Sequence, residues 1–296
     1  INFGGRILEE DDKKGRKKYD HSNDDLTPLT KETKKIEYNG KIAYLKPMLI
    51  EKAVDGRPFK KRPTILVLPG GGYGFVSDRE GEPVARYFNA AGFNCFVLRY
   101  TVNQAEACFP APLYQAAKAV EYIRQNCDEF NVDPSRVFVI GFSAGGHLAA
   151  WLSNGCGSDL AKSLKIDETL SKPNGQVLCY PVITGEKGLA NEGSFVNLFG
   201  CEDFRERSEL PDLSCERMVT KNSPPAFIWQ TVDDDIVPSE NSLIMASALK
   251  RAGVPFELHM YESGPHGLSV CDETSEMVSK ECEGWKKLCV DFLKRL

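Results

Sequence analysis

Histidine is scarce in this sequence, and several larger features are missing from it. Four histidines among 296 residues, with no Cys-x-x-Cys pair, give no zinc-type cluster, so we predict no metal and no other cofactor. No apolar run approaches the ~20 residues of a membrane-spanning helix, and the first residues lack the apolar stretch of a signal peptide. A basic surplus is also missing. The formal net charge of -5 argues against nucleic acid or an anionic membrane as partner.

The ten cysteines do not resemble a disulfide framework. They are scattered from Cys95 to Cys289 without regular spacing, and several lie within or beside apolar strand or helix patterns. Such cysteines behave as small buried hydrophobic residues in a reducing compartment, so the sequence predicts a cytoplasmic protein. Ile1 at the first position is compatible with a leader removed upstream.

What is present is the composition of a soluble globular protein, with 42% hydrophobic and 27% charged residues. Residues 1–35 are polar and lack sustained periodicity, which predicts an N-terminal arm. Residues 36–296 are predicted to form a single domain, within which residues 183–224 interrupt the pattern and are predicted to form a lid or cap. The sequence leaves the formation of homo-oligomers open.

Short apolar strands alternate with amphipathic helices from Thr64 onward. This alternation predicts an α/β fold with a mostly parallel sheet and helices on both faces. An edge strand is predicted at 42–50 and a turn at Asp55-Gly56. The other predicted strands are 64–68, 93–98, 137–140 (after the break at Asp133-Pro134-Ser135), 176–180, 226–231 and 256–261, and the predicted helices are 82–91, 113–126, 144–152, 239–252 and about 278–293.

The candidate nucleophile is Ser143 in Gly141-Phe142-Ser143-Ala144-Gly145. This G-x-S-x-G motif follows a predicted strand and opens a predicted helix, which is the context that raises a serine hydroxyl above the sheet edge. A glycine-rich turn whose serine only caps the helix is the alternative.

The candidate oxyanion hole follows the strand at 64–68, in Pro69-Gly70-Gly71-Gly72-Tyr73. Acyl transfer places negative charge on the former carbonyl oxygen, and backbone N–H groups must meet it. We therefore predict the amides of Gly71, Gly72 and Ala144 as donors. A flexible turn is the alternative. A phosphate-binding loop is disfavoured because no Gly-Lys-Ser/Thr follows.

Three histidines follow Ser143 and could act as its base. His147 is one helical turn along and is predicted to face the core or a neighbouring strand, and His259 lies inside a predicted strand. His266 lies in Gly264-Pro265-His266-Gly267, a loop just past the last strand, where a base can reach the serine hydroxyl. The sequence therefore favours His266.

The acid that orients the base is harder to choose, because Asp233, Asp234 and Asp235 are adjacent. They follow the predicted strand 226–231, in the position that the order Ser, acid, His requires. One carboxylate is expected to turn inward while the others are solvated or cap the following helix. Spacing to Val237-Pro238 favours Asp234.

These segments together resemble the α/β-hydrolase superfamily and, within it, the acetyl-esterase and acetylxylan-esterase-like branch. The resemblance covers residues 64–296, including Leu66–Tyr73, Glu80–Ala85, Val139–Ala149, Pro224–Thr231 and Val237–Ser242. It implies that an acid placed as Asp234 serves the triad. The chain departs from related lipases at Pro69, where they carry the histidine of a His-Gly-Gly-Gly motif, and this weakens a lipase interpretation.

The resemblance implies a serine esterase acting on short acyl esters, including acetyl groups on plant-polysaccharide sugars or oligosaccharides. Tyr73 and residues 183–224 are expected to shape the pocket. A serine peptidase of the same fold is one alternative, although it usually carries a large extra domain. A non-catalytic binding protein of the same fold is another, although it usually lacks a triad member.

Overall fold

The computed structural model describes residues 33–50, 60–103 and 106–296. One compact unit extends from Lys34 to Leu296. The predicted arm lies almost wholly outside the described residues, as does the predicted turn at Asp55-Gly56. Among the described residues, no helix is long and apolar enough to cross a membrane.

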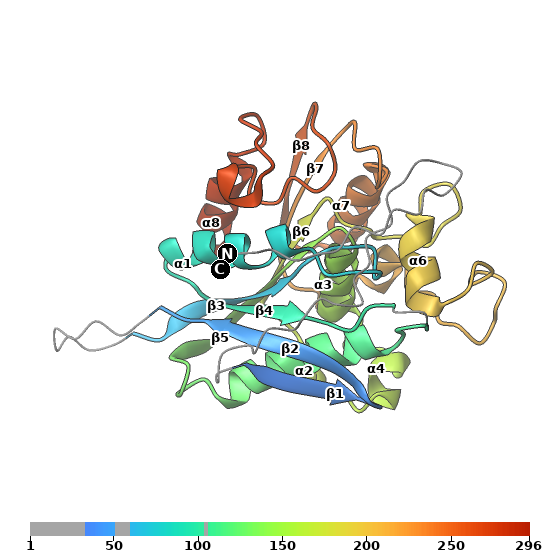
Figure 1. Cartoon of the computed structure of the whole chain (residues 1–296), viewed down its shortest axis with the longest axis horizontal. Helices are drawn as coiled ribbons and strands as arrows, with labels where there is room; N and C mark the ends of the chain where they lie inside the picture. The colour runs from blue at the N-terminus through green and yellow to red at the C-terminus, as the bar shows by residue number, and fades with distance from the viewer. Residues whose placement is uncertain (1–32, 51–59, 104–105) are drawn as a thin grey trace, which may run out of the picture. The chain divides into compact units, whose positions relative to one another are not determined.

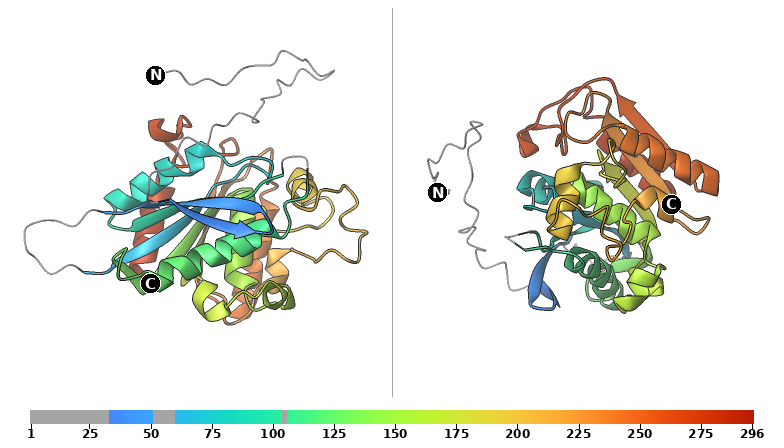
Figure 2. Two further views of the ribbon diagram at one scale, coloured as in Figure 1. Left: turned by 60° about the horizontal axis from the view of Figure 1, so that its bottom comes forward. Right: turned by 90° about the vertical axis from the view of Figure 1, so that its right-hand side faces the viewer.

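The unit is built around an eight-stranded sheet with the order β1-β2-β4-β3-β5-β6-β7-β8 (Figure 1). The pairs β1–β2 and β2–β4 are antiparallel, and every other neighbouring pair is parallel. The strands twist progressively across the sheet (Figure 2). Their bounds are β1 Lys34–Tyr38, β2 Lys41–Met48, β3 Arg62–Leu68, β4 Asn94–Arg99, β5 Val132–Phe142, β6 Gly175–Cys179, β7 Ala226–Thr231 and β8 Phe256–Tyr261.

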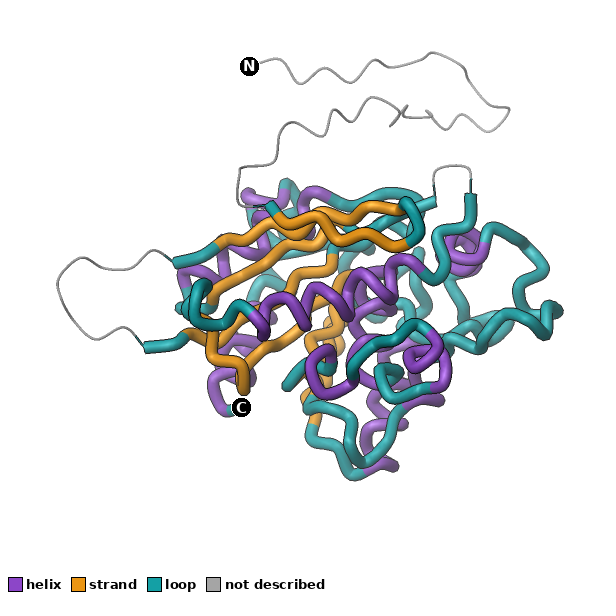
Figure 3. Tube along the Cα trace, turned by 90° about the horizontal axis from the view of Figure 1, so that it is seen from below, coloured by secondary structure: helices purple, strands orange, loops and turns teal. Residues whose placement is uncertain are grey.

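Helices cover both faces of the sheet (Figure 3), which confirms the predicted architecture. Two separate hydrophobic clusters lie on the two faces. One includes side chains of α2, α3 and α7, and the other includes side chains of α1 and α8. The α-helices are α1 Glu82–Ala90, α2 Ala111–Gln125, α3 Ala144–Asn154, α4 Asp159–Ser163, α5 Glu168–Ser171, α6 Glu192–Phe199, α7 Glu240–Ala252 and α8 Trp285–Arg295, and the 3₁₀ turns are η1 Asp78–Glu80, η2 Cys215–Met218 and η3 Glu273–Ser275.

The edge-strand prediction for 42–50 is wrong in its position. The strand β2 pairs with β1 on one side and with β4 on the other, so it is internal. The edge strand on this side of the sheet is β1, which the sequence did not reveal because only Ile36 of its five residues is buried. This strand begins at Lys34, inside the segment predicted to be an arm.

The predicted break at Asp133-Pro134-Ser135 is an irregularity within β5. Arg62 of β3 pairs with Val132, and two residues later Thr64 pairs with Val137, so extra residues bulge from β5 between these pairs. Proline can be accommodated there because a bulge interrupts the ladder.

The last helix is shorter than predicted. It begins at Trp285 rather than near Val278, whose side chain is exposed. Turns precede it and end at Gly284, a poor helix former.

Candidate functional site

Four loops that carry the predicted site residues follow the carboxyl ends of β3, β5, β7 and β8. In a parallel arrangement these ends meet at one edge of the sheet, where ligands bind in open α/β folds. Residues 69–73 after β3 are called the oxyanion loop below, and residues 262–269 after β8 are called the base loop.

Ser143 occupies a sharp turn between β5 and α3 with φ of 52°, a left-handed conformation that is costly for a residue with a Cβ. Its neighbours must be glycine because the chains approach closely. A Cβ on Gly141 would lie 2.1 Å from the carbonyl oxygen of Gly145, and one on Gly145 would lie 2.1 Å from that of Leu68. The motif therefore packs its turn against the end of β3.

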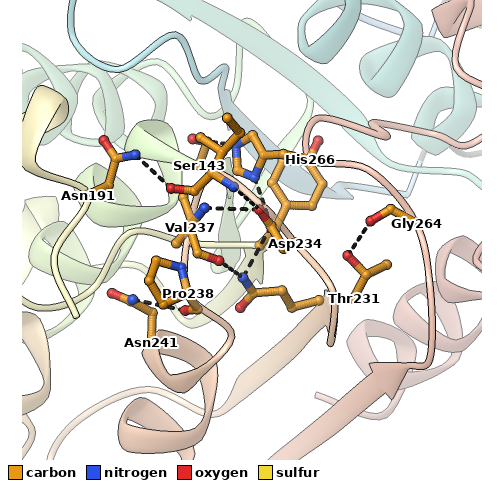
Figure 4. Close-up of polar contacts among 12 residues, drawn as sticks. Ser143, Asn191, Thr231, Asp234, Val237, Pro238, Asn241, Gly264 and His266 are labelled. Atoms are coloured by element: carbon orange, nitrogen blue, oxygen red, sulfur yellow. Dashed lines mark hydrogen bonds and ion pairs between the residues drawn. The ribbon is translucent and has the colours of Figure 1, made fainter. Parts of the chain in front are cut away.

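The predicted triad side chains are hydrogen-bonded to one another (Figure 4). Nε2 of His266 lies 2.8 Å from Oγ of Ser143, and Nδ1 of His266 lies 2.8 Å from Oδ2 of Asp234. An ionised carboxylate can only accept, so Nδ1 carries the proton and Nε2 is free to accept the serine proton. The structure thus brings together three side chains from three loops in the geometry of a general base and its orienting acid.

Asp234 is held as an anion by its surroundings. Its side chain has no exposed surface, whereas that of His266 is 13% exposed. Burial acts to raise the pKa of the Asp234 carboxyl, but the contact with His266 and the amides of Val237 and Ile236 lower the pKa by more, to below its usual value. Both amides donate to Oδ1, at 2.9 and 3.0 Å, while Oδ2 bonds the imidazole at 2.8 Å and also accepts from Nε2 of Gln230 at 3.2 Å.

The three adjacent aspartates have different environments. Asp233 accepts hydrogen bonds from the hydroxyl of Ser263 and the amide of Gly264, at 2.7 and 2.8 Å, so it supports the base loop. Asp235 is exposed to solvent. Of the two expectations for the spare aspartates, solvation holds for Asp235, while the N-cap residue of α7, Ser239, makes no side-chain cap.

The oxyanion loop lies directly beside the nucleophile. A Cβ placed on Gly70 would lie 3.0 Å from Cβ of Ser143. Gly71 and Gly72 have φ of 122° and 60°, conformations that favour glycine. Among the described residues, the amides of Gly71 and Gly72 have no hydrogen-bond partner. The amide of Ala144, in the first turn of α3, has no acceptor within its helix.

Tyr73 does not line an open surface, contrary to the prediction that it shapes the pocket. The residue is 1% exposed, and its hydroxyl lies 2.8 Å from Nδ1 of His147. Nε2 of His147 lies 2.9 Å from the carbonyl oxygen of Leu213 and must donate to it, so Nδ1 accepts from Tyr73. Burial lowers the pKa of His147 to about 4, and the imidazole is neutral. His147 therefore has a structural role, as predicted.

Helix α6 in the predicted lid contacts two of the site loops. Nδ2 of Asn197 donates to the carbonyl oxygen of Gly72 at 2.8 Å, and Nδ2 of Asn191 donates to that of Ile236 at 2.9 Å. Sequence reasoning missed both asparagines, because nothing local distinguishes them from other polar loop residues. A cavity of about 350 Å³ lies within residues 185–217, but no triad residue lines it.

The described residues contain no group of three or more His, Cys, Asp or Glu side chains that could hold a metal ion. All ten cysteines are free thiols, and eight of them are buried.

Residues 56–249 match the BD-FAE family. The chain is 36% identical over 215 residues to endo-1,4-beta-xylanase B of Butyrivibrio fibrisolvens and 29% identical over 206 residues to the acetylxylan esterase of Xylanibacter ruminicola. These matches cover 72% and 69% of this chain but only 33% and 40% of those proteins, so the chain spans well under half of either relative.

Solved structures show the same fold over most of their length. An acetyl ester-xyloside bifunctional hydrolase from Caldicellulosiruptor lactoaceticus is 37% identical, with a TM-score of 0.71 and coverage of 87% of this chain and 89% of that one. The carboxylesterase Cest-2923 from Lactobacillus plantarum is 25% identical, with a TM-score of 0.79 and coverage of 89% and 96%.

Proposed function

We propose that this chain, which belongs to the BD-FAE family, is a serine esterase that removes short acyl groups from sugar or oligosaccharide alcohols. One observation carries the proposal, namely the continuous hydrogen bonding from Ser143 through His266 to Asp234, at 2.8 Å in each link. The names of an acetylxylan esterase and an acetyl ester-xyloside hydrolase among similar proteins support the substrate class.

The first half of the reaction follows from the protonation pattern. Oγ of Ser143 attacks the ester carbonyl carbon while Nε2 of His266 takes the hydroxyl proton. The amides of Gly71, Gly72 and Ala144 stabilise the oxyanion that forms. Asp234 stabilises the imidazolium through Nδ1. When the tetrahedral intermediate collapses, the C–O bond to the alcohol breaks, and His266 returns its proton to the departing oxygen.

The second half regenerates the enzyme. The acyl group is now bonded to Oγ of Ser143, and Nε2 of His266 takes a proton from a water molecule that attacks the acyl carbon. Collapse of the second tetrahedral intermediate breaks the bond to Ser143, whose oxygen recovers the proton from His266. The products are a carboxylic acid and an alcohol.

Turnover of p-nitrophenyl acetate by the wild-type chain and by Ser143→Ala tests the nucleophile. We expect kcat to fall at least about 10³-fold, since attack then lacks its nucleophile and only the oxyanion hole and binding remain. Ser247→Ala, at an exposed position on α7, is the matched control and should retain wild-type activity. Undiminished activity in Ser143→Ala would refute the assignment.

Two further assays separate the alternatives. Covalent labelling by a fluorophosphonate should occur in the wild type and not in Ser143→Ala, and no labelling of either would favour a non-catalytic binding protein. Release of acetate from acetylated xylo-oligosaccharides should exceed hydrolysis of p-nitrophenyl decanoate and of peptides. Faster cleavage of peptides would favour a serine peptidase instead.

A further inference from the structure

Behind the candidate oxyanion hole lies a buried acid that the mechanism does not use. Glu80, in the 3₁₀ turn before α1, is 3% exposed, and no described cation forms an ion pair with it. Its Oε2 accepts a hydrogen bond from the amide of Gly70 at 2.8 Å, and its Oε1 accepts one from the hydroxyl of Tyr180 at 2.7 Å. A buried carboxylate is costly unless such bonds compensate it, so this contact has a structural or functional reason.

Tyr180 extends the connection to the base loop. It follows β6 directly, is 2% exposed, and its hydroxyl accepts a hydrogen bond from the amide of Ser269 at 2.8 Å while donating to Glu80. Its ring packs edge-on against the imidazole of His266, with centroids 4.9 Å apart. Tyr180 has a φ of 36°, a strained backbone conformation for a residue with a Cβ.

These contacts join the two loops that must cooperate in acyl transfer. Gly70 precedes the amides of Gly71 and Gly72, and Ser269 lies three residues after His266. The connection from Gly70 through Glu80 and Tyr180 to Ser269 is made entirely of buried groups. It is reinforced by the hydroxyl of Ser269, which donates to the carbonyl oxygen of Arg79 at 2.6 Å.

We propose that Glu80 and Tyr180 are positioning residues that fix the oxyanion loop relative to the base loop. The inference rests on the proposed function for its catalytic meaning, but the geometric coupling is a separate claim. A misplacement of catalytic groups by about 1 Å can lower the rate about 10²-fold. Breaking a buried link between the donor amides and the base should therefore lower kcat measurably.

A carboxyl group offers two oxygens, one for each of the donors at this position. A glutamine has the same size, but its amide nitrogen must face either the Gly70 amide or the Tyr180 hydroxyl. The first arrangement sets two donors against each other, and the second leaves the tyrosine proton without its acceptor. Glu80→Gln therefore disturbs the link without opening a cavity. Tyr180→Phe keeps the ring against His266 and removes only the hydroxyl.

The test compares Glu80→Gln and Tyr180→Phe with matched controls on α1. Glu82→Gln alters a carboxylate two residues away that forms surface ion pairs with Lys46 and Arg86, and Tyr87→Phe alters a half-buried tyrosine outside the site.

Steady-state hydrolysis of p-nitrophenyl acetate should show kcat lowered roughly 10- to 100-fold in Glu80→Gln, with KM within about twofold of wild type. Both controls should retain wild-type values. The double variant should lose little more than Glu80→Gln alone, since both changes cut the same link.

Amide hydrogen exchange supplies a readout that does not need ester turnover. Peptides covering residues 69–77 and 262–271 should exchange faster in both test variants than in the controls, while peptides from β5 and α3 stay protected. If Glu80→Gln fails to fold, judged by its thermal transition, the same two measurements on Tyr180→Phe decide between the outcomes.

The outcomes separate this proposal from the esterase function. Unchanged kcat together with unchanged exchange in both loops would overturn the positioning role. A fall in kcat with exchange rising throughout the chain would also overturn it, since that result indicates general destabilisation. A wild-type chain without ester turnover, whose loops nevertheless loosen in the variants, would refute the esterase function and leave the coupling intact.

Discussion

The buried imidazole of His147 predicts a specific acid sensitivity. In the folded chain its pKa is lowered to about 4 from the ordinary 6.5, chiefly by burial, although the bond to the Leu213 carbonyl oxygen opposes this. The unfolded chain binds a proton near the ordinary value, whereas the folded chain does not until the pH approaches 4. Because the unfolded state then binds more protons, stability falls as the pH is lowered through this window.

The magnitude follows from the two pKa values. A tenfold difference in proton affinity corresponds to about 1.4 kcal/mol, so the loss attributable to His147 is about 2 kcal/mol between pH 7 and pH 5. It approaches about 3 kcal/mol near pH 4. Protonation is unfavourable because the imidazole has no exposed surface to solvate a charge, and because a protonated Nδ1 could no longer accept the hydrogen bond from Tyr73.

Urea unfolding of the wild type and of His147→Gln at pH 7 and pH 5 measures this contribution. The variant should be less stable than wild type at pH 7, and it should lose about 2 kcal/mol less on acidification, since glutamine does not titrate. Working at pH 5 stays above the range in which Asp234 titrates, because its pKa is lowered from 3.8. The stability that this carboxylate contributes is lost only at still lower pH.

His259→Gln is the matched control. It makes the same substitution on β8, where 26% of the side-chain surface is exposed, and reports the effect of replacing a histidine outside the buried core. Equal losses of stability in the wild type and in His147→Gln would contradict the reasoning, because His147 would then bind its proton equally in both states.

Two other predictions concern the site loops. Asp234→Asn should lower kcat for p-nitrophenyl acetate about 10⁴-fold because an amide no longer fixes the imidazole tautomer, whereas Asp233→Asn, which touches only the base loop, should cost less than about tenfold. Gly145→Ala should lower the free energy of unfolding by roughly 2–3 kcal/mol or more in urea titrations, since its Cβ would overlap the carbonyl oxygens of Leu68 and Pro69.

The elements that form this site were predictable because their signals are local. The central parallel strands contain runs of buried apolar residues, and β7 and β8 have the predicted bounds. Ser143 and His266 were singled out because each follows a strand at the same sheet edge, and the structure brings them into contact. Strand β1 was missed for the opposite reason, since an edge strand with one buried residue has almost no pattern to detect.

The choice among three aspartates shows where local patterns fail. Spacing favours Asp234, but nothing in the sequence indicates that Asp233 bonds to the base loop. Its partners are Ser263 and Gly264, about 30 positions along the chain. The donors that a carboxylate bonds are set by tertiary contacts. The folded structure is therefore needed to distinguish a carboxylate beside the imidazole from one that bonds the loop carrying it.

Tyr73 also shows that a local pattern does not reveal tertiary partners, and here the expected substrate contact is a buried residue. An aromatic residue beside an oxyanion loop is a reasonable substrate contact when the loop is considered alone. Its hydroxyl instead pairs with His147, 74 residues away, and that histidine in turn bonds Leu213, a further 66 residues along the chain. The tyrosine therefore links the oxyanion loop to α3 and to the segment predicted as a lid. If this link holds the loop, acid that protonates His147 should impair turnover as well as folding. His147→Gln removes the group that titrates at this position, so acid should lower its turnover less than that of the wild type.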